Sequence, residues 1–264
     1  MKIAIAGKGG TGKTTLAGTL ARTFAQKGYK VLAIDADPAM NLAYSLGIEK
    51  DAIAKIVPLY ENKELIEERT GIKVDGMFGV AFSLTPKVND IADKFGIKGP
   101  DGVILLIMGT VKSGGIGCMC PANALLRALL RHLLIERDEI VIMDMEAGLE
   151  HLGRGTAKGV DALLIVVEPG IQSIETAVRI KKLGEEIGIS NFITIGNKIK
   201  SLKDEVFLKE KLSKANLNLF YSIPYDEKIV EADMLRIAPI DYAKNSKAIE
   251  AIKIIGDFLI KLNF

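Results

Sequence analysis

The chain has 264 residues, of which 48% are hydrophobic and 26% are charged, and its formal net charge at pH 7 is +2. This balance suits a full apolar core and excludes an extended disordered chain, and the near-neutral charge gives no reason to expect a nucleic-acid partner. No apolar run reaches the roughly 18 residues that a membrane-spanning helix needs, and the N-terminus has the pattern of a strand and loop, not of a signal peptide. We therefore expect a cytoplasmic protein without stable membrane association.

The first predicted element is an apolar strand at residues 2–6, followed by the loop GKGGTGKTT and a helical pattern over residues 14–26. The spacing G-x-x-x-x-G-K-T between a strand and a helix predicts a P-loop. Its backbone N–H groups and the positive end of the helix favour the phosphates of ATP. In such a loop Lys13 reaches the β- and γ-phosphates and the Thr14 hydroxyl ligates Mg²⁺. The other cofactor-binding candidates of the loop are Gly9, Gly10, Thr11, Gly12 and Thr15.

A second lysine, Lys8, lies just after the first glycine of the loop. The stretch KGGTGKTT resembles the deviant Walker A loop of the MinD/ParA/nitrogenase-iron-protein class. The resemblance implies that Lys8 crosses a dimer interface and supplies a cation where negative charge develops on the partner's nucleotide. The alternative is a solvated loop lysine.

Short apolar runs alternate with helical patterns along the rest of the chain, and runs without internal alternation are typical of strands buried on both faces. Strands are predicted at residues 2–6, 31–35, 103–108, 139–143, 162–167, 192–196 and 219–223, and helices at 14–26, 122–134, 173–187, 203–214 and 242–262. We predict an α/β fold of the P-loop NTPase type, with a mostly parallel twisted sheet of about seven to eight strands flanked by helices. Residues 1–264 are expected to form a single ATPase domain, with residues 47–102 as an irregular insertion at one edge.

Two aspartates follow the second predicted strand, in the run DADPAMNL. The carboxyl end of a strand beside the P-loop faces the nucleotide and its Mg²⁺. The run resembles the switch I region of the same ATPase class, which implies that Asp37 positions the attacking water and that Asp35 lies in the outer shell of Mg²⁺. The alternative is a pair of capping aspartates before a short helix.

The chain has two cysteines, Cys118 and Cys120, in the run GGIGCMCPAN. They are too close together to staple a fold, and in a reducing compartment a metal site is favoured over a disulfide. The parallel sheet places them on the P-loop edge, at a helix N-terminus that favours thiolates, which are soft ligands for Ni²⁺, Zn²⁺, Cu⁺ or Fe–S clusters. One C-x-C supplies half of a four-ligand site, so we predict a metal shared on a two-fold axis by two copies of the chain. The alternative is a pair of packed core cysteines.

The predicted strand at residues 139–143 runs directly into Asp144, the arrangement of a Walker B carboxylate that holds Mg²⁺ directly or through water. The stretch DMEAGLEHLGRG that begins there occupies the position of a second switch loop. Later, Asn197 follows another strand, and an Asn amide can pair with the edge of adenine. Pro224, in the run SIPYD, would close over the base in this class; turn or capping roles are the alternative for both residues. The amphipathic last helix has a polar face of mixed charge, so we expect it to pack on the sheet and not on a membrane.

In combination, KGGTGKTT, DADPAMNL, GCMCP and DMEAGLEHLGRG resemble the CooC-type nickel-insertion ATPases, which mature carbon monoxide dehydrogenase, within the MinD/ParA class. The resemblance implies an ATPase with ATP and Mg²⁺ as cofactors and Ni²⁺, or Zn²⁺ in its place, at Cys118 and Cys120. It also implies a homodimer formed on ATP or metal binding and carbon monoxide dehydrogenase as acceptor. His151 and, with less reason, His132 are further candidate ligands.

Three alternatives stay open at this point. The first is an ATPase like the nitrogenase iron protein that carries an iron–sulfur cluster, although that family uses cysteines on two separated loops. The second is an Mrp-like cluster carrier, for which C-x-x-C would be expected. The third is a MinD/ParA-like positioning ATPase, which has no use for the C-x-C pair.

Overall fold

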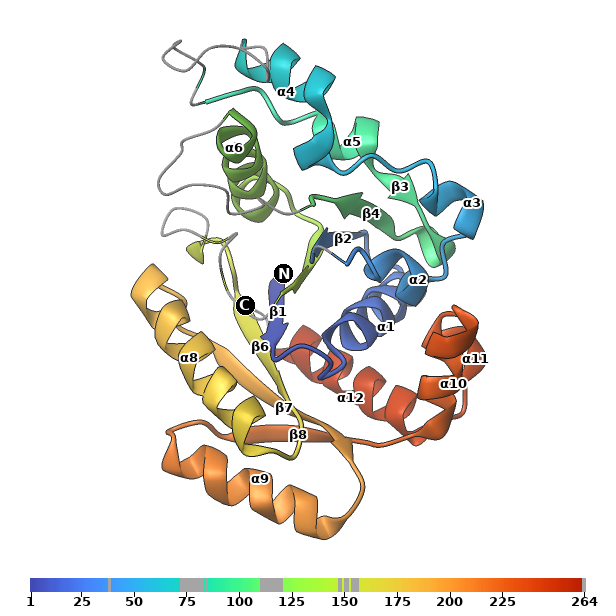
Figure 1. Ribbon diagram of the computed structural model, residues 1–264, viewed down its shortest axis with the longest axis vertical. Coiled ribbons are helices and arrows are strands. Elements are labelled where there is room, and N and C mark those ends of the chain that lie inside the picture. Colours follow the sequence, from blue (N-terminus) through green and yellow to red (C-terminus); the bar gives the residue numbers. More distant parts are fainter. Residues whose placement is uncertain are drawn as a thin grey trace.

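The computed structural model describes residues 1–37, 39–71, 83, 85–109, 121–146, 149, 152 and 157–262. These residues form an eight-stranded sheet in the order β3-β4-β2-β5-β1-β6-β7-β8 (Figure 1). The strands are β1 (Lys2–Gly7), β2 (Val31–Ala36), β3 (Ile97–Lys98), β4 (Ile104–Ile107), β5 (Ile140–Met145), β6 (Ala162–Val167), β7 (Phe192–Ile199) and β8 (Leu219–Pro224). All neighbouring strands are parallel except β3 and β4, so the predicted mostly parallel sheet is confirmed.

Helices cover both faces of this sheet (Figure 1). They are α1 (Lys13–Gln26), α2 (Leu42–Leu46), α3 (Lys50–Ile53), α4 (Lys63–Thr70), α5 (Ile91–Phe95), α6 (Pro121–Ile135), α8 (Ile171–Ile187), α9 (Leu202–Lys214), α10 (Glu227–Leu235), α11 (Pro239–Tyr242) and α12 (Lys247–Lys261). Two 3₁₀ turns, η1 (Leu59–Glu61) and η2 (Pro100–Gly102), lie between α3 and β4. Helices α1 and α12 pack on one face of the sheet, and α6, α8 and α9 pack on the other.

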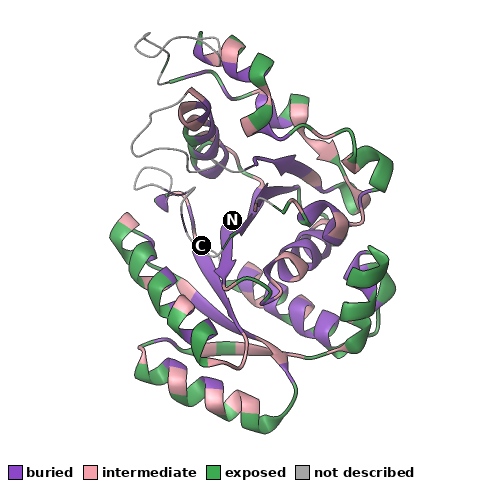
Figure 2. Cartoon of the chain, viewed as in Figure 1, coloured by how far each residue is buried: buried purple, intermediate pink, exposed green. Residues whose placement is uncertain are grey.

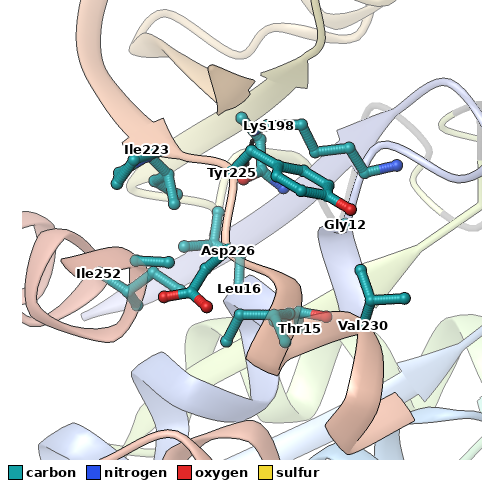
Figure 3. Close-up of a pocket in the computed structure, with 13 residues that line it drawn as sticks. Gly12, Thr15, Leu16, Lys198, Ile223, Tyr225, Asp226, Val230 and Ile252 are labelled. Atoms are coloured by element: carbon teal, nitrogen blue, oxygen red, sulfur yellow. Dashed lines mark hydrogen bonds between the residues drawn. The ribbon is translucent and has the colours of Figure 1, made fainter. Parts of the chain in front are cut away.

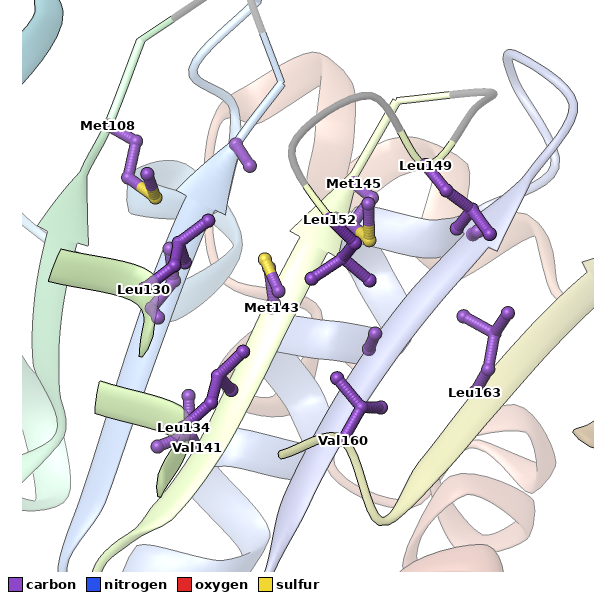
Figure 4. Close-up of a cluster of buried hydrophobic side chains, with 14 of the residues drawn as sticks. Met108, Leu130, Leu134, Val141, Met143, Met145, Leu149, Leu152, Val160 and Leu163 are labelled. Carbon is purple, nitrogen blue, oxygen red and sulfur yellow. The ribbon is translucent and has the colours of Figure 1, made fainter. Parts of the chain in front are cut away.

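Alternate residues of the central strands face the two halves of the core. In β1, Ile3 and Ile5 belong to the cluster beneath α1 and α12, whereas Ala4 and Ala6 belong to the cluster on the opposite face. Figure 4 shows this second cluster, with side chains of β5 and β6 beside leucines of α6. The sheet is buried and the outer surfaces of the helices are exposed (Figure 2), so the strands are buried on both faces as predicted.

One expectation about the helices is changed by the structure. The predicted helix at 242–262 is wrong at its start: α11 ends at Tyr242, and α12 begins at Lys247, where Ser246 accepts hydrogen bonds from the backbone N–H groups of Ala248 and Ile249. The segment 47–102 contributes α4, α5 and the antiparallel strand β3, which forms one edge of the sheet. The prediction that the last helix packs on the sheet is confirmed by its buried apolar face. Within the described residues, every helix is too short or too polar to cross a bilayer.

Helix α1 is fastened to later parts of the chain at two points. Ser45 lies directly against the backbone of Gly18, where an added Cβ would be 2.4 Å from the serine hydroxyl, and this hydroxyl donates to the Thr14 carbonyl at 2.9 Å. On the far turn, the buried Arg22 donates to Asp241 at 2.8 Å and also pairs with Asp101. These contacts fix the helix that begins at the phosphate loop.

Candidate phosphate and magnesium site

The P-loop connects β1 to α1 and curls around one carbonyl group. The Lys8 carbonyl accepts hydrogen bonds from the backbone N–H of Thr11 at 3.3 Å and from the Thr11 hydroxyl at 2.8 Å. The Lys13 ammonium also approaches this carbonyl, at 3.4 Å, and the lysine side chain is nearly buried. The lysine that the motif assigns to the phosphates is therefore already folded back over the loop.

Gly12 is a loop position that tolerates no side chain. Its φ of +92° lies in the left-handed region, and a Cβ there would be 2.3 Å from Nδ2 of Asn197. Both the backbone conformation and the close approach require glycine. The Asn197 side chain of β7 therefore lies directly against the backbone at the start of α1.

Asn197 and Lys198 tie β7 to the phosphate loop. The Asn197 amide nitrogen donates to the Thr11 carbonyl at 2.7 Å, and the Lys198 ammonium donates to the Gly10 carbonyl. The sequence predicted that Asn197 contacts adenine; in this structure it contacts the loop and lines the neighbouring pocket. Sequence reasoning missed Lys198, although an Asn-Lys pair after a strand beside a P-loop was a usable signal.

The pocket in Figure 3 lies beside the first turn of α1, between that helix and the segment after β8. Leu16, Ile223 and Ile252 form apolar walls, and Pro224 and Tyr225 lie at its edge. The Lys200 ammonium lies 4.5 Å from the centroid of the Tyr225 ring. An apolar pocket that adjoins a phosphate loop and ends in an aromatic ring suits a flat base. Asn197 and Pro224, the two residues that the sequence assigns to adenine, both line this pocket.

Two carboxylates lie at the carboxyl ends of adjacent strands next to the loop. Asp35 of β2 and Asp144 of β5 are register partners, and both are buried. Asp35 accepts hydrogen bonds from the backbone N–H groups of Asp37, at 3.1 Å, and Leu42, at 3.0 Å. Burial, together with the charge of Asp144, raises the pKa of Asp35 to about 8. Asp37 itself accepts from the Ala39 N–H at 2.8 Å and so closes a tight turn after the strand.

Asp144 has the chemistry of a cation ligand. Burial raises its pKa to about 7, against the opposing influence of the Thr14 hydroxyl and the Lys13 ammonium. Among the described residues, neither of its carboxylate oxygens has a well-formed hydrogen bond. A buried carboxylate without partners, beside a threonine hydroxyl, fits the oxygen ligands that Mg²⁺ prefers. Thr14 and Asp144, the two residues that the sequence assigns to Mg²⁺, thus lie side by side.

Lys8 turns away from the phosphate loop and toward Glu168, the residue that follows β6. Its ammonium lies 3.9 Å from Oε1 of Glu168, and the Lys198 ammonium lies 3.3 Å from Oε2 of the same side chain. One carboxylate therefore sits between two cations at the rim of the loop. Sequence reasoning missed Glu168, because no motif marks it.

The predictions for Cys118, Cys120 and His151 fall outside the described part of the chain, as does most of the second switch stretch after Glu146. His132 is described: it lies in α6, eleven residues beyond Pro121, and its Nδ1 is 2.8 Å from Oε2 of Glu136. That separation is about 16 Å along a helix, so His132 is far from the end of α6 that follows the cysteines. The described residues contain no group of three or more potential metal-ligating His, Cys, Asp or Glu side chains.

Comparison with known proteins places this site in a family. Residues 2–240 match the model described as CobQ/CobB/MinD/ParA nucleotide binding domain. An uncharacterised ATP-binding protein of Methanocaldococcus jannaschii is 47% identical over 263 residues, 99% of this chain and 98% of that protein. The carbon monoxide dehydrogenase accessory protein CooC of Rhodospirillum rubrum is 44% identical over 241 residues, 91% of this chain and 90% of CooC. The structure of Pyrococcus horikoshii MinD with Mg-ADP matches with a TM-score of 0.70 at 20% identity, over 99% of this chain and 96% of that one.

The loop between β1 and α1, the Lys13 side chain folded over it and the buried carboxylate on β5 define a P-loop nucleotide-binding protein. The chain belongs to the CobQ/CobB/MinD/ParA nucleotide-binding family, and within it to the CooC-type ATPases of the MinD/ParA class. The class predicted from the motifs is therefore confirmed.

Proposed function

We propose that this chain is an ATP-dependent metallochaperone that assists the insertion of nickel into carbon monoxide dehydrogenase. The observation that carries the proposal is its 44% identity, over 91% of its length, to a protein described as a carbon monoxide dehydrogenase accessory protein. The C-x-C pair of Cys118 and Cys120 supplies the soft ligands that such a cargo needs.

The nucleotide half of the mechanism uses the residues at the strand ends. Lys13 and the backbone N–H groups from Gly9 to Thr15 bind the phosphates, and the Asn197–Pro224 pocket receives the base. Thr14 and Asp144 would hold Mg²⁺, with Asp35 behind them. When bound, Mg²⁺ neutralises charge that develops on the phosphates.

Hydrolysis also needs an oriented water and a further cation. Asp37 begins the turn at the end of β2, next to the buried pair, and we assign it the orientation of the attacking water. Lys8 lies on the loop with a flexible side chain that is 38% exposed, and we assign it to the partner's nucleotide. ATP hydrolysis at the full rate would then require a homodimer.

The metal half depends on symmetry. Two copies that meet across their nucleotides would bring together two Cys118 and two Cys120 thiolates, which makes the four ligands of a closed site. Nickel is the cargo, with zinc in its absence. We propose that ATP and metal favour the closed dimer and that hydrolysis opens it at the acceptor, in a cytoplasm that keeps the thiols reduced.

The test is to measure bound metal per chain and the dimer fraction, with and without an ATP analogue and Mg²⁺, in the wild type and in Cys118→Ala. We expect one nickel or zinc per two chains in the nucleotide-bound dimer, and loss of that metal in Cys118→Ala with ATP binding retained. The same preparation without nucleotide is the control.

Two results would contradict the proposal. One metal per chain in a monomer would exclude a shared site. A brown, visible-absorbing protein after anaerobic purification would instead indicate an iron–sulfur cluster and one of the alternative functions.

A further inference from the structure

Glu168 lies between two lysine ammonium groups at the rim of the phosphate loop. Its Oε1 is 3.9 Å from the Lys8 ammonium and its Oε2 is 3.3 Å from the Lys198 ammonium. The backbone is fixed, because the Glu168 N–H donates to the Ser173 hydroxyl, at 3.0 Å, in the first turn of α8. The carboxylate therefore has a defined position, whereas each lysine reaches it through a flexible stem.

We propose that Glu168 holds Lys8 in its own subunit and so raises the protein concentration at which two nucleotide-bound chains pair. The proposal rests on the function proposed above, in which Lys8 acts on the partner's nucleotide. A lysine that contacts Glu168 of its own chain is turned away from that task. Each pairing event must therefore break two such contacts, one in each subunit.

The second cation makes this release feasible. When Lys8 leaves, Glu168 keeps the Lys198 ammonium, which lies closer to it and also donates to the Gly10 carbonyl. Lys198 lies at the edge of the base pocket (Figure 3), so the carboxylate stays neutralised beside the nucleotide. Lys8 can therefore depart without leaving an unpaired negative charge next to the phosphates.

The restraint is expected to be weak. The side chains of Lys8 and Glu168 are 38% and 27% exposed, and ion pairs of this kind change an equilibrium by only a few-fold. A weak ion pair is sufficient to shift the protein concentration at which the chains pair. It does not prevent pairing, because Lys8 interacts more strongly with the phosphates of the partner's nucleotide than with one carboxylate.

The experiment measures the pairing midpoint, which is the protein concentration for half-maximal dimer with an ATP analogue and Mg²⁺, by sedimentation velocity. Glu168→Gln keeps the shape of the side chain and removes its charge. We expect the midpoint to fall about two- to fivefold, with kcat at saturating protein unchanged. Glu175→Gln, at an exposed glutamate in the second turn of α8, is the matched control and should leave the midpoint unchanged.

The dependence on Lys8 is tested in a Lys8→Met background, where Glu168→Gln should produce no further shift. An unchanged or higher midpoint in Glu168→Gln alone, or the same shift in both backgrounds, would overturn the role assigned to Glu168. A different result would refute the proposed function itself. If Lys8→Met pairs and hydrolyses ATP as well as the wild type, Lys8 does not act on the partner's nucleotide.

Discussion

Asp35 and Asp144 are register partners on the adjacent strands β2 and β5, so two buried carboxyl groups lie side by side next to the phosphate loop. Two adjacent carboxylates in a dry site disfavour each other's charge. The nucleotide-free protein therefore stores unfavourable electrostatic free energy at the place where a divalent cation would relieve it. This relationship leads to a prediction about pH.

Burial raises the pKa of Asp35 to about 8 and that of Asp144 to about 7, from 3.8. Between about pH 4 and pH 8 the folded chain then binds more protons than the unfolded chain, so its stability falls as pH rises, by at most about 1.4 kcal/mol per pH unit for each carboxyl. In Asp144→Asn we expect a stability gain over the wild type that grows from pH 5 to pH 8, measured by urea unfolding without nucleotide. A gain that stays constant with pH would show that Asp144 titrates normally. Mg²⁺ affinity of the wild type should rise with pH over the same window.

Gly12→Ala should abolish nucleotide binding. The left-handed backbone costs an alanine about 1–2 kcal/mol, and its Cβ would collide with Asn197 at 2.3 Å and push the loop away from β7. Isothermal titration with ATP and a thermal melt are the measurements. Gly28→Ala is the control, since Gly28 has the same left-handed backbone, lies outside the phosphate loop, and an added Cβ there meets nothing within 4 Å; if both variants bind ATP alike, the close contact with Asn197 is unimportant.

Asp37→Ala should trap a nucleotide-bound dimer. Removing the carboxylate that we assign to the attacking water leaves the buried pair and the phosphate loop intact, so binding survives while turnover falls by at least about 10²-fold. Steady-state ATPase rates and gel filtration with ATP measure the two effects. Asp51→Ala, at an exposed position in α3, should behave like the wild type. Unchanged turnover in Asp37→Ala would refute the assignment.

Arg22→Met should destabilise the fold without altering ATP affinity in the molecules that remain folded. Arg22 is 4% exposed, forms ion pairs with Asp101 and Asp241, and donates a hydrogen bond to the Leu46 carbonyl. Because both aspartates are partly exposed, the loss should be about 1–3 kcal/mol, below the value for a fully buried pair. Lys27→Gln, which breaks the exposed pair with Asp257, should cost well under 1 kcal/mol. Equal losses in urea unfolding would contradict the special place of Arg22.

Much of the fold was predictable because the parallel strands are continuous apolar runs. Residues such as Ile140 and Ala162 begin strands that the sequence located within a residue or two. The two-residue strand β3 has no period to detect, and its position depends on pairing with β4. The predicted helix at 242–262 passed over the break between α11 and α12, although the polar run AKNS at residues 243–246 ends in Ser246, the cap of the new helix.

The parts of the site that could be predicted are those marked by motifs of consecutive residues. The P-loop, Asp35 and Asp144 each follow a strand, and parallel strands bring such positions to one edge. Glu168 belongs to the same edge, but its role comes from the distance to Lys8 and Lys198, which lie far from it in sequence. A lone glutamate after a strand carries no pattern, so only the folded arrangement reveals it.

The contact between Gly18 and Ser45 limits how the loop after β2 can respond to nucleotide. Helix α2 packs on α1 through that contact, and its first residue, Leu42, donates its N–H to the Asp35 carboxylate at the end of β2. We therefore expect α2 to keep its position when nucleotide binds. Any rearrangement around Asp37 must be absorbed by backbone rotation in the few residues before Leu42. We therefore expect nucleotide binding in the dimer to change the conformation of this short turn in each subunit, while the sheet and the helices around it keep their positions.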